Sequence, residues 1–335
     1  MRLRALFVVV PLVVLAACSS GSSDNTSSTS ASGSSSEAAT PGPEVPPDTA
    51  LAEPVAADQL PTASGAFGEK PTLTFPATDP VPTLQRVVLS EGTGPLTTAG
   101  QTLVTNYLGQ VWGGTVFDNS YDKGSSSVFS IGTGAVVPGW DVGLVGVPVG
   151  SRVLLNLPPN DGYGMTGNAS AGITGTDTLV FVVDIVGAYD ATAAGQTDAT
   201  PVPLPATGPQ VTGELGTAPT LTIPAGTAEP TAASATVIAT GTGPAVTDGQ
   251  VLAQYDAVTW DGQPYASTWP NSAAAQQGAP TGPQAIPVAT GGPFAGLAGI
   301  PVGSRVLVVI SGQADPSTGQ TQPAIAAVVD IVAQI

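Results

Sequence analysis

An internal repeat constrains the fold of this chain more than any other feature of its sequence. Four short segments recur in the same order at separations of 146 to 153 residues. The pairs are Pro71–Ala77 with Pro219–Ala225, Gly92–Pro95 with Gly241–Pro244, Val147–Leu154 with Ile300–Leu307, and Val183–Val186 with Val329–Val332. Solenoid repeats are roughly 20 to 50 residues long, so this longer period indicates duplicated domains in tandem. We therefore expect domains over 65–190 and 213–335, joined by a linker over 191–212.

Within the first copy, the residue pattern is mostly that of β-strands. Leu103–Tyr107, Val153–Leu157 and Thr178–Val186 are β-branched or aromatic runs bounded by Gly, Pro, Asn and Asp, which predicts strands. Pro138–Val145 is the one helical candidate, because Pro suits a first turn and Trp140 lies one turn before Leu144. An antiparallel sheet curled over one short helix is the simplest way to bury this pattern. The predicted fold class is α+β, mostly β, in each of two tandem domains.

The N-terminal segment has the pattern of an export signal followed by a tether. Arg2 and Arg4 precede an apolar run that ends in Leu15-Ala-Ala-Cys18, which predicts a signal peptide over 1–17. This ending resembles the bacterial lipoprotein signal, in which the Cys is lipidated, so Cys18 is the expected lipidation site. The Ser- and Pro-rich residues 18–64 offer little to offset the entropy of ordering, and we expect a disordered tether there.

Composition excludes several classes of chemistry. The chain has no His and one Cys, so it has no Ser-His-Asp or Cys-His catalytic arrangement, no imidazole metal site and no internal disulfide. Seven Lys and Arg stand against 24 Asp and Glu, and the formal net charge of −17 argues against nucleic acid as a partner. Almost no amphipathic helical pattern is present, which disfavours the two α/β lobes of a solute-binding protein.

Six motifs of the first copy occur in one collinear order over about 100 residues. They are Tyr107-Leu-Gly109, Gly114-Thr-Val-Phe-Asp-Asn-Ser120, Val136-Val-Pro-Gly-Trp-Asp-Val-Gly-Leu144, Val149-Gly-Ser-Arg152, Pro158-Pro-Asn-Asp-Gly-Tyr-Gly164 and Thr178-Leu-Val-Phe181. Together they resemble the FKBP-type peptidyl-prolyl cis-trans isomerases, the macrolide-binding immunophilins. Each motif alone is weak, and the six in register make the resemblance specific.

The resemblance implies an apolar aromatic pocket in the first domain. Its lining would be Tyr107, Phe117, Asp118, Val136, Val137, Trp140, Tyr163 and Phe181, with Ile173 as a further candidate. Trp140 would form the floor, the Val137 N–H and the Tyr163 hydroxyl would donate hydrogen bonds to substrate carbonyls, and Asp118 would bond Tyr107. Rotation of an X–Pro amide needs no nucleophile, general base, metal or cofactor, so a chain without His can catalyse it.

The sequence departs from the family's pattern in one wall of the pocket and throughout the second copy. Ser127 falls where the family has a pocket aromatic, which predicts weaker binding of macrolide inhibitors, while Phe129 matches a core position. In the second copy Tyr265-Ala266 replaces Phe117-Asp118, and Ala327 replaces Phe181. Ala289–Pro293 replaces the Trp140 segment, and Gly312–Gly319 replaces the Tyr163 segment. We expect this copy to fold without catalysing.

These patterns predict an exported, membrane-anchored peptidyl-prolyl cis-trans isomerase that assists the folding of secreted proteins. Its partners would be proline-containing polypeptides and exported client proteins, and its location extracytoplasmic, on a lipid anchor at Cys18. The alternative is a non-catalytic lipoprotein that binds protein segments through both repeats. Ser127 and the low aromatic content, 5% of residues, keep this alternative open.

Overall fold

The computed structural model describes residues 49–314 and 321–335. The expected signal peptide, Cys18 and most of the expected tether lie outside these residues. Within the described ranges no helix is long and apolar enough to cross a membrane.

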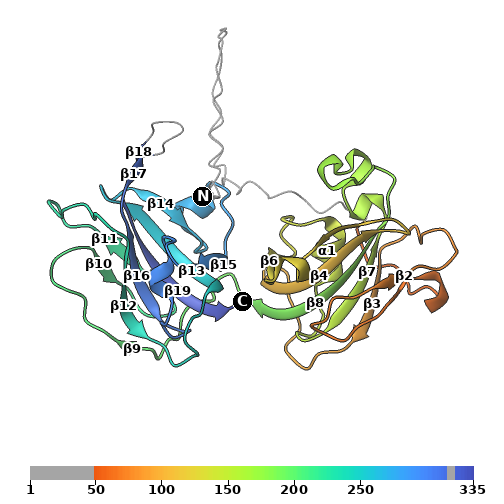
Figure 1. The fold of residues 1–335 in the computed structure, drawn as a ribbon, viewed down its shortest axis with the longest axis horizontal. Coiled ribbons are helices and arrows are strands. Elements are labelled where there is room, and N and C mark those ends of the chain that lie inside the picture. Colours follow the sequence, from red (N-terminus) through yellow and green to blue (C-terminus); the bar gives the residue numbers. More distant parts are fainter. Residues whose placement is uncertain (1–48, 315–320) are drawn as a thin grey trace, which may run out of the picture. The chain divides into compact units, whose positions relative to one another are not determined.

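The first half of the chain folds into one antiparallel sheet (Figure 1). Its strand order is β3-β7-β8-β4-β5, and β6 pairs with the remaining part of β4. The strands are β3 (Gln85–Ser90), β4 (Thr102–Val111), β5 (Val116–Asn119), β6 (Ser127–Ser130), β7 (Arg152–Leu157) and β8 (Leu179–Tyr189). The three strands expected from sequence therefore correspond to β4, β7 and β8, except that Thr178 precedes β8, and the antiparallel pairing is as predicted.

The second half forms a sheet with the same strand order and one strand more. Its path is β14-β13-β19-β16-β12-β9, with β15 paired to β13 as β6 is to β4. The strands are β9 (Thr200–Pro201), β12 (Ser234–Thr240), β13 (Gly249–Thr259), β14 (Pro264–Ser267), β15 (Gln284–Val288), β16 (Arg305–Ile310) and β19 (Ile325–Gln334). Strand β9 has no counterpart in the first sheet, where β3 is the last described strand on that side.

Three short hairpins and several single-turn helices complete the described structure. The hairpins pair β1 (Thr62–Ala63) with β2 (Leu73–Thr74), β10 (Gln210–Thr212) with β11 (Thr220–Thr222), and β17 (Gln313–Ala314) with β18 (Thr321–Gln322). The α-helices are α1 (Pro138–Gly143) and α2 (Ala273–Gln276). The 3-10 turns are η1 (Ala57–Gln59), η2 (Tyr121–Lys123), η3 (Pro159–Asp161), η4 (Gly164–Thr166), η5 (Ala169–Ala171) and η6 (Ala295–Leu297).

Helix α1 covers one face of the first sheet, as the sequence predicts, although it ends at Gly143, two residues early. Pro138 occupies its first turn, and both Trp140 and Leu144 are buried against the sheet. Gly139 and Gly143 let the helix approach closely, because a Cβ at either would lie 2.5 to 2.8 Å from the side chain of Leu157 or Leu155. This close packing of α1 on the sheet fixes the position of Trp140 in the core.

The opposite face of each sheet carries a buried ion pair. Arg152 on β7 bonds Asp184 on β8 at 2.6 Å, and Arg305 on β16 bonds Asp330 on β19 at 2.8 Å. Each guanidinium also donates to two backbone carbonyls of a preceding segment, Gly65 and Glu69 in the first half and Glu214 and Thr217 in the second. A buried charge must be paired and hydrogen-bonded, so this pair fastens each preceding segment to its sheet.

The expected C-terminal bound of the disordered tether is wrong, and the expected linker contains regular structure. The tether was expected to reach residue 64, but Leu60 is buried, the Ala52 N–H donates to the Leu84 carbonyl and β1 pairs with β2. The expected linker over 191–212 contains β9 and the start of the β10–β11 hairpin, and Ala199 is buried. Both segments are ordered by tertiary hydrogen bonds, which leave no periodicity in the sequence.

The prediction of one short helix under each sheet is wrong for the second half. The segment equivalent to α1 contains only the 3-10 turn η6, and α2 follows β14 at a different place in the chain. The sequence there is Gly291-Gly-Pro293, and Gly291 has a φ of +81°, which an α-helix cannot accommodate.

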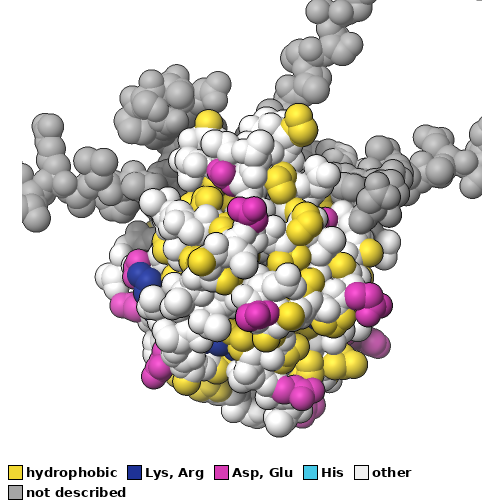
Figure 2. Space-filling model, turned by 90° about the vertical axis from the view of Figure 1, so that its right-hand side faces the viewer, with side chains coloured by type: hydrophobic (Ala, Val, Ile, Leu, Met, Phe, Trp, Pro, Cys, Tyr) yellow, Lys and Arg dark blue, Asp and Glu magenta, His cyan; other side chains and the backbone are white. Residues whose placement is uncertain are grey.

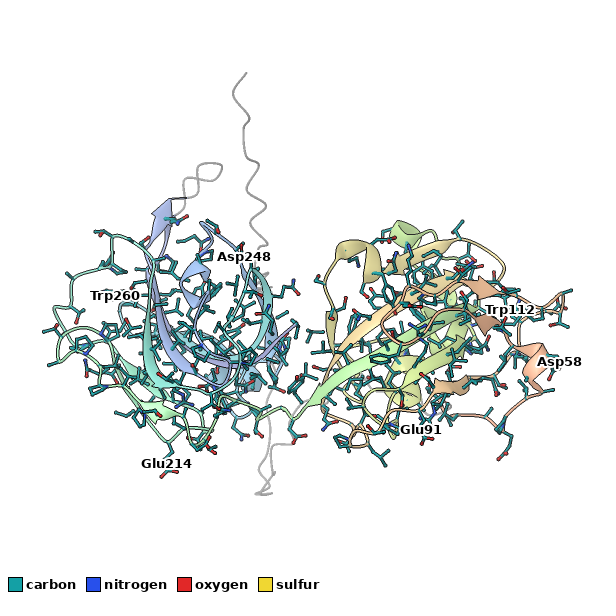
Figure 3. All side chains as sticks on the ribbon, turned by 60° about the horizontal axis from the view of Figure 1, so that its bottom comes forward. Asp58, Glu91, Trp112, Glu214, Asp248 and Trp260 are labelled. Carbon is teal, nitrogen blue, oxygen red and sulfur yellow. The ribbon has the colours of Figure 1, made fainter. Side chains whose placement is uncertain are left out.

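On the face of each sheet that carries the buried Arg–Asp pair, a Trp side chain packs against the apolar cluster. It is Trp112 in the first half and Trp260 in the second (Figure 3).

Candidate functional site

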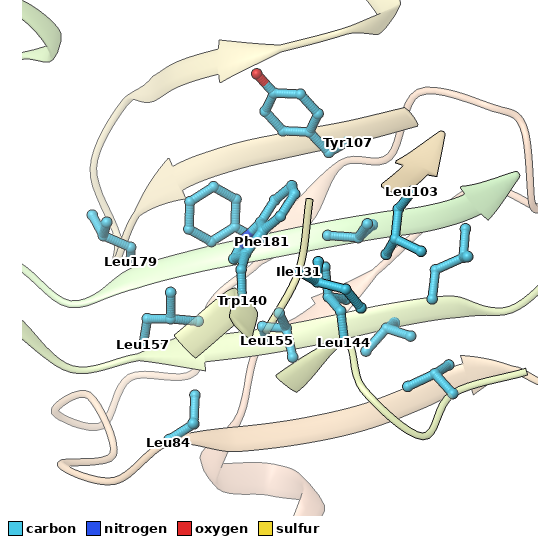
Figure 4. Packing of buried hydrophobic residues seen from close by; sticks show 14 of the residues in the cluster. Leu84, Leu103, Tyr107, Ile131, Trp140, Leu144, Leu155, Leu157, Leu179 and Phe181 are labelled. Atoms are coloured by element: carbon cyan, nitrogen blue, oxygen red, sulfur yellow. The ribbon is translucent and has the colours of Figure 1, made fainter. Parts of the chain in front are cut away.

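Five aromatic side chains meet between α1 and the first sheet. Trp140 lies at the centre, with its ring centroid 5.5 Å from Tyr107, 5.3 Å from Phe181 and 5.1 Å from Phe129, each edge-on. Phe117 packs edge-on against Phe181 at 5.5 Å. Figure 4 shows Tyr107, Trp140 and Phe181 converging over the sheet. Edge-to-face packing is the preferred geometry for aromatic pairs, so this cluster is a stable apolar box.

A glycine in β4 makes room for two of these rings. A Cβ built on Gly109 would lie 2.7 Å from both the Phe117 and the Phe181 rings. Contacts this short are not tolerated, so the cluster requires Gly at this position. This explains the Gly of the Tyr107-Leu-Gly motif, and it is a signal that the sequence interpretation did not use.

The residues around Trp140 leave polar groups available to a ligand. The indole Nε1–H is buried and has no hydrogen-bond partner among the described residues. The Val137 N–H, at the N-terminus of α1, likewise donates to no described backbone acceptor, while its carbonyl accepts from Trp140. Val136 and Val137 are partly buried against the aromatic cluster. An apolar box with a few unused donors is the usual composition of a small binding site.

Asp118 links the aromatic box to the solvent. The Tyr107 hydroxyl donates to one of its carboxylate oxygens, and the Lys123 ammonium pairs with the other at 2.6 Å. Burial and then the Asp118 carboxylate raise the pKa of the Tyr107 hydroxyl, which therefore stays protonated as a donor. Although burial alone raises the pKa of the Asp118 carboxyl, the hydrogen bonds from Lys123 and Tyr107 outweigh it and hold that pKa below its usual value.

The turn η2 connects Asp118 to the opposite face of the sheet through three consecutive side chains. The Tyr121 hydroxyl donates to Asp184 of the buried ion pair at 2.9 Å. Asp122 pairs with Lys70 of the preceding segment at 2.6 Å, and Lys123 bonds Asp118. Lys123 also lies 5.9 Å from the Tyr107 ring centroid, within cation–π range. The rim of the site is therefore held by contacts on both faces, and Lys123 is a site residue that the sequence interpretation missed.

The loop after η3 supplies the last two candidates, Tyr163 and Ile173. Ile173 is buried in the same core cluster as Trp140, and paired backbone hydrogen bonds with Asn168 at 2.8 and 2.9 Å fix its position. Tyr163 is 38% exposed, and its hydroxyl bonds no described residue. It lies between η3 and η4, on the same loop as Ile173.

The structure brings eight of the nine predicted residues into contact in or beside this cluster, while Tyr163 lies on the adjoining loop and is partly exposed. It also changes the interpretation of the wall that contains Ser127. Ser127 indeed carries no ring there, but Phe129, assigned to the core by sequence, packs against both Tyr107 and Trp140. The spacing of residues in the sequence does not reveal this, because it cannot show that the Phe129 ring fills the space beside Ser127.

The equivalent positions of the second half are confirmed by strand register. Gly109 lies opposite Phe181 and Asp118, and in the second half Ala257 lies opposite Ala327 and Ala266. Phe294 is partly buried against the second core, and no Trp is part of that cluster. The second half therefore retains the sheet and lacks both the aromatic floor and the carboxylate.

Charge and metal-binding groups add little to the site. Among the described residues no cluster of three or more His, Cys, Asp or Glu side chains could hold a metal ion. Figure 2 shows one face of the molecule, on which acidic side chains are scattered among hydrophobic and neutral ones, with basic side chains in places. The site is an apolar box with one paired carboxylate, and it suits binding and desolvation better than acid–base chemistry.

Sequence comparison assigns this architecture to a family. Residues 94–186 match the family described as FKBP-type peptidyl-prolyl cis-trans isomerase. The chain is 39% identical over 119 residues to the FK506-binding protein of Streptomyces anulatus, covering 35% of this chain and 96% of that protein. It is also 41% identical over 87 residues to FK506-binding protein 2 of Yarrowia lipolytica, covering 26% of this chain and 60% of that protein.

Two solved structures are similar to part of this chain. AtFKBP13 is 32% identical, with 31% of this chain and 91% of that chain covered and a TM-score of 0.29. FkpA from Escherichia coli is 34% identical, with 32% and 49% covered and a TM-score of 0.30. On the sequence matches, the chain belongs to the FKBP-type peptidyl-prolyl cis-trans isomerase family.

Proposed function

We propose that the first half is an active peptidyl-prolyl cis-trans isomerase that acts on exported, proline-containing polypeptides. The observation that carries this proposal is the aromatic box floored by Trp140, with the Tyr107–Asp118 hydrogen bond at its rim. Family membership supports the reaction type.

The chemistry of the reaction suits such a box. An X–Pro amide rotates over a barrier of about 18–20 kcal/mol because resonance stabilises its planar forms. The twisted amide has lost that resonance and is less dipolar than the ground state. Transfer into an apolar site therefore costs the twisted amide less than the planar one, and this difference lowers the barrier.

Donors around the box would hold the flanking peptide while the amide rotates. The Val137 N–H and the Tyr163 hydroxyl bond no described residue and are free to donate to substrate carbonyls. The proline ring would pack on Trp140, between Tyr107 and Phe181. Lys123 and Asp118 would keep the Tyr107 ring in place, so that the box retains its shape without substrate.

Catalysis is tested on the chain from residue 18 with a panel of X–Pro tetrapeptides, by following cis-to-trans relaxation. We expect acceleration over the uncatalysed rate and loss of most of it in Trp140→Ala. The retained far-UV circular dichroism of that variant is the folding control. A wild-type rate at background would refute the enzyme and favour a non-catalytic protein-binding module.

We also propose that the chain is exported and anchored through a lipid on Cys18. The Leu15-Ala-Ala-Cys18 sequence after a positively charged apolar segment supports this. Stable anchoring requires two acyl chains or an equivalent second signal. Expression with labelled palmitate should label the wild-type chain and not Cys18→Ser, and the variant should leave the detergent phase. Equal labelling of both would contradict the anchor.

Finally, we propose that the two sheets are tandem FKBP-like domains, with 213–335 non-catalytic. The shared strand order and the repeated Arg–Asp pair support the duplication. Ala266 and Ala327 in place of Asp118 and Phe181 support the loss of catalysis. This division would be contradicted if isomerase activity persisted in Trp140→Ala and was abolished by substitutions in the second half.

A further inference from the structure

The two sheets differ at one edge. In the second half, β9 pairs with β12, so that Ala239 lies opposite Pro201 and Thr240 opposite Thr200. The Val202 N–H extends this pairing with a 2.6 Å bond to the Ile238 carbonyl. Residues 200–204, Thr-Pro-Val-Pro-Leu, thus cover this edge as an extended segment. In the first half no described strand pairs with the equivalent edge of β3.

The equivalence of the two edges is set by register. In both sheets the pairing shifts by one residue at the same place, between Val88 and Ser90 in β3 and between Val237 and Ala239 in β12. Ser90 lies opposite Arg152, as Ala239 lies opposite Arg305. Leu89 is therefore the counterpart of Ile238, the residue whose carbonyl accepts the bond from Val202.

The uncovered edge is apolar. Val87, Val88 and Leu89 are 37%, 41% and 38% exposed. Sheet edges are normally protected by outward charges, especially Lys. The one charged residue of β3 gives no such protection, because the Arg86 guanidinium donates to the carbonyls of Gly143 and Val145.

The second half shows what completes such an edge. Leu204 and Ile238 pack on a cluster formed by Leu307, Val309 and Ala326. The corresponding cluster of the first half, around Leu154, takes Ala63, Leu73 and Phe75 from the preceding segment. It contains no residue from an added edge strand and does not include Leu89. An apolar side chain is therefore missing beside Leu89 among the described residues.

The segment preceding the first sheet follows a different course. Its Ala52 N–H donates to the Leu84 carbonyl, and its Glu53 carbonyl and Val55 N–H bond the Gln85 side chain. These contacts lie at the start of β3. From Val87 to Ser90 the strand pairs with β7 on one side and with no described residue on its outer side. Only the late part of the edge is open.

We propose that β3 is a docking site for an extended, uncharged, proline-containing segment of another polypeptide, bound as an added strand. Strand addition supplies main-chain hydrogen bonds, and pockets for alternate side chains supply selectivity. Proline is acceptable there, because an edge strand does not need every N–H and Pro201 already occupies the equivalent position. The site is separate from the aromatic box and would hold a client chain while its X–Pro bonds reach Trp140.

The probe is a blocked, fluorescent peptide of residues 199–205, Ala-Thr-Pro-Val-Pro-Leu-Pro, measured by anisotropy against the chain from residue 18. We expect saturable binding that Leu89→Lys weakens at least tenfold. Val186→Lys is the matched control, since Val186 is 44% exposed on β8 of the same sheet, and it should bind as the wild type does. Leu89→Lys should still isomerise tetrapeptides, so failure of this inference and failure of the proposed activity are distinguishable.

Three results would overturn the proposal. The first is the absence of saturable binding, and the second is unchanged binding of the probe by Leu89→Lys. The third is displacement of the probe by excess X–Pro tetrapeptide, which would show that the probe binds in the aromatic box. Folding of Leu89→Lys is checked by amide exchange of β7 and β8. If that variant is unfolded, Val87→Lys is tested in its place. In either case, added amide protection along β3 on probe saturation is required for the proposal to stand.

Discussion

The two halves of the chain share a scaffold and differ in what it encloses. Both have the same strand order and a buried Arg–Asp pair that fastens the preceding segment. In the first half Gly109 lies under the Phe117 and Phe181 rings, whereas the second half has Ala257 and Ala327 at equivalent positions. The second half thus has the sheet without the residues that line the site in the first half. The sheet and the site are separate requirements on the sequence.

The largest expected effect tests whether the halves are independent in stability. Asp184→Ala leaves the Arg152 guanidinium buried without its partner, which should destabilise the first half by about 3–5 kcal/mol. Native-state amide exchange measures each sheet separately, and we expect protection to fall in β7 and β8 while β16 and β19 keep theirs.

Asp330→Ala is the matched variant in the second half, and it should reverse the pattern. Loss of protection in both sheets from either change would show that the halves unfold as one unit.

The next largest effect is expected from a substitution that gives the first half the residue found at the equivalent position of the second half. Phe181→Ala removes a buried ring that contacts Trp140 and Phe117, and should cost about 3 kcal/mol of stability. Loss of one wall of the box should also lower kcat/KM by about 100-fold, as expected when a reacting group is no longer held in position.

The measurement is tetrapeptide isomerisation, with folding checked by amide exchange of β8. Ala327→Phe in the second half is the converse variant and should not create activity, since Trp140 and Asp118 have no equivalents there. An active Ala327→Phe in a Trp140→Ala background would refute this comparison.

A single methyl group at the glycine of β4 should have a smaller effect. Gly109→Ala places a Cβ 2.7 Å from two rings and should cost about 1–3 kcal/mol through overpacking. Its counterpart Ala257→Gly removes a methyl group from a strand and should cost about 0.5–1 kcal/mol. Thermal denaturation of the two variants gives the comparison, and equal costs would show that the rings of the first half move aside freely.

Much of the fold was predictable because its signals are local or repeated. The strands containing Leu103–Tyr107 and Val153–Leu157 follow from composition, and the repeat located the counterparts of Arg152 and Asp184. The ordered segment before the first sheet was not predictable from its sequence, which is rich in Pro and Ala, because it is held by hydrogen bonds to distant residues, such as that from the Ala52 N–H to the Leu84 carbonyl.

The candidate site was predictable in its members and less so in its geometry. Resemblance supplied Tyr107 and Trp140, and both lie in the cluster. Phe129 was placed in the core because spacing along β6 does not show which rings meet above the sheet, and Lys123 was missed because an ion pair across η2 leaves no pattern in sequence. The five rings of the cluster come from five segments, β4, β5, β6, α1 and β8, and the sequence pattern of no single segment shows that they meet.

The smallest expected effect concerns the carboxylate that the second half lacks. Asp118→Ala removes the acceptor of the Tyr107 hydroxyl and should lower kcat/KM about tenfold, equivalent to about 1.4 kcal/mol. Asp122→Ala is the matched control. Asp122 lies on η2, the turn after Asp118, and its exposed ion pair with Lys70 is lost in this variant, which should change the rate by less than about fivefold.

The same carboxylate predicts a dependence on pH. The pKa of Asp118 is lowered from 3.8 in the folded state, so its interactions stabilise the site above that pH and are lost as the pH falls through the lower folded value. Wild-type kcat/KM should therefore decline only as the pH falls below 3.8, through the lowered pKa of Asp118, toward that of Asp118→Ala, whose own rate should change less over the same range. Parallel acid profiles for the two proteins would mean that Asp118 does not hold Tyr107 in the working site.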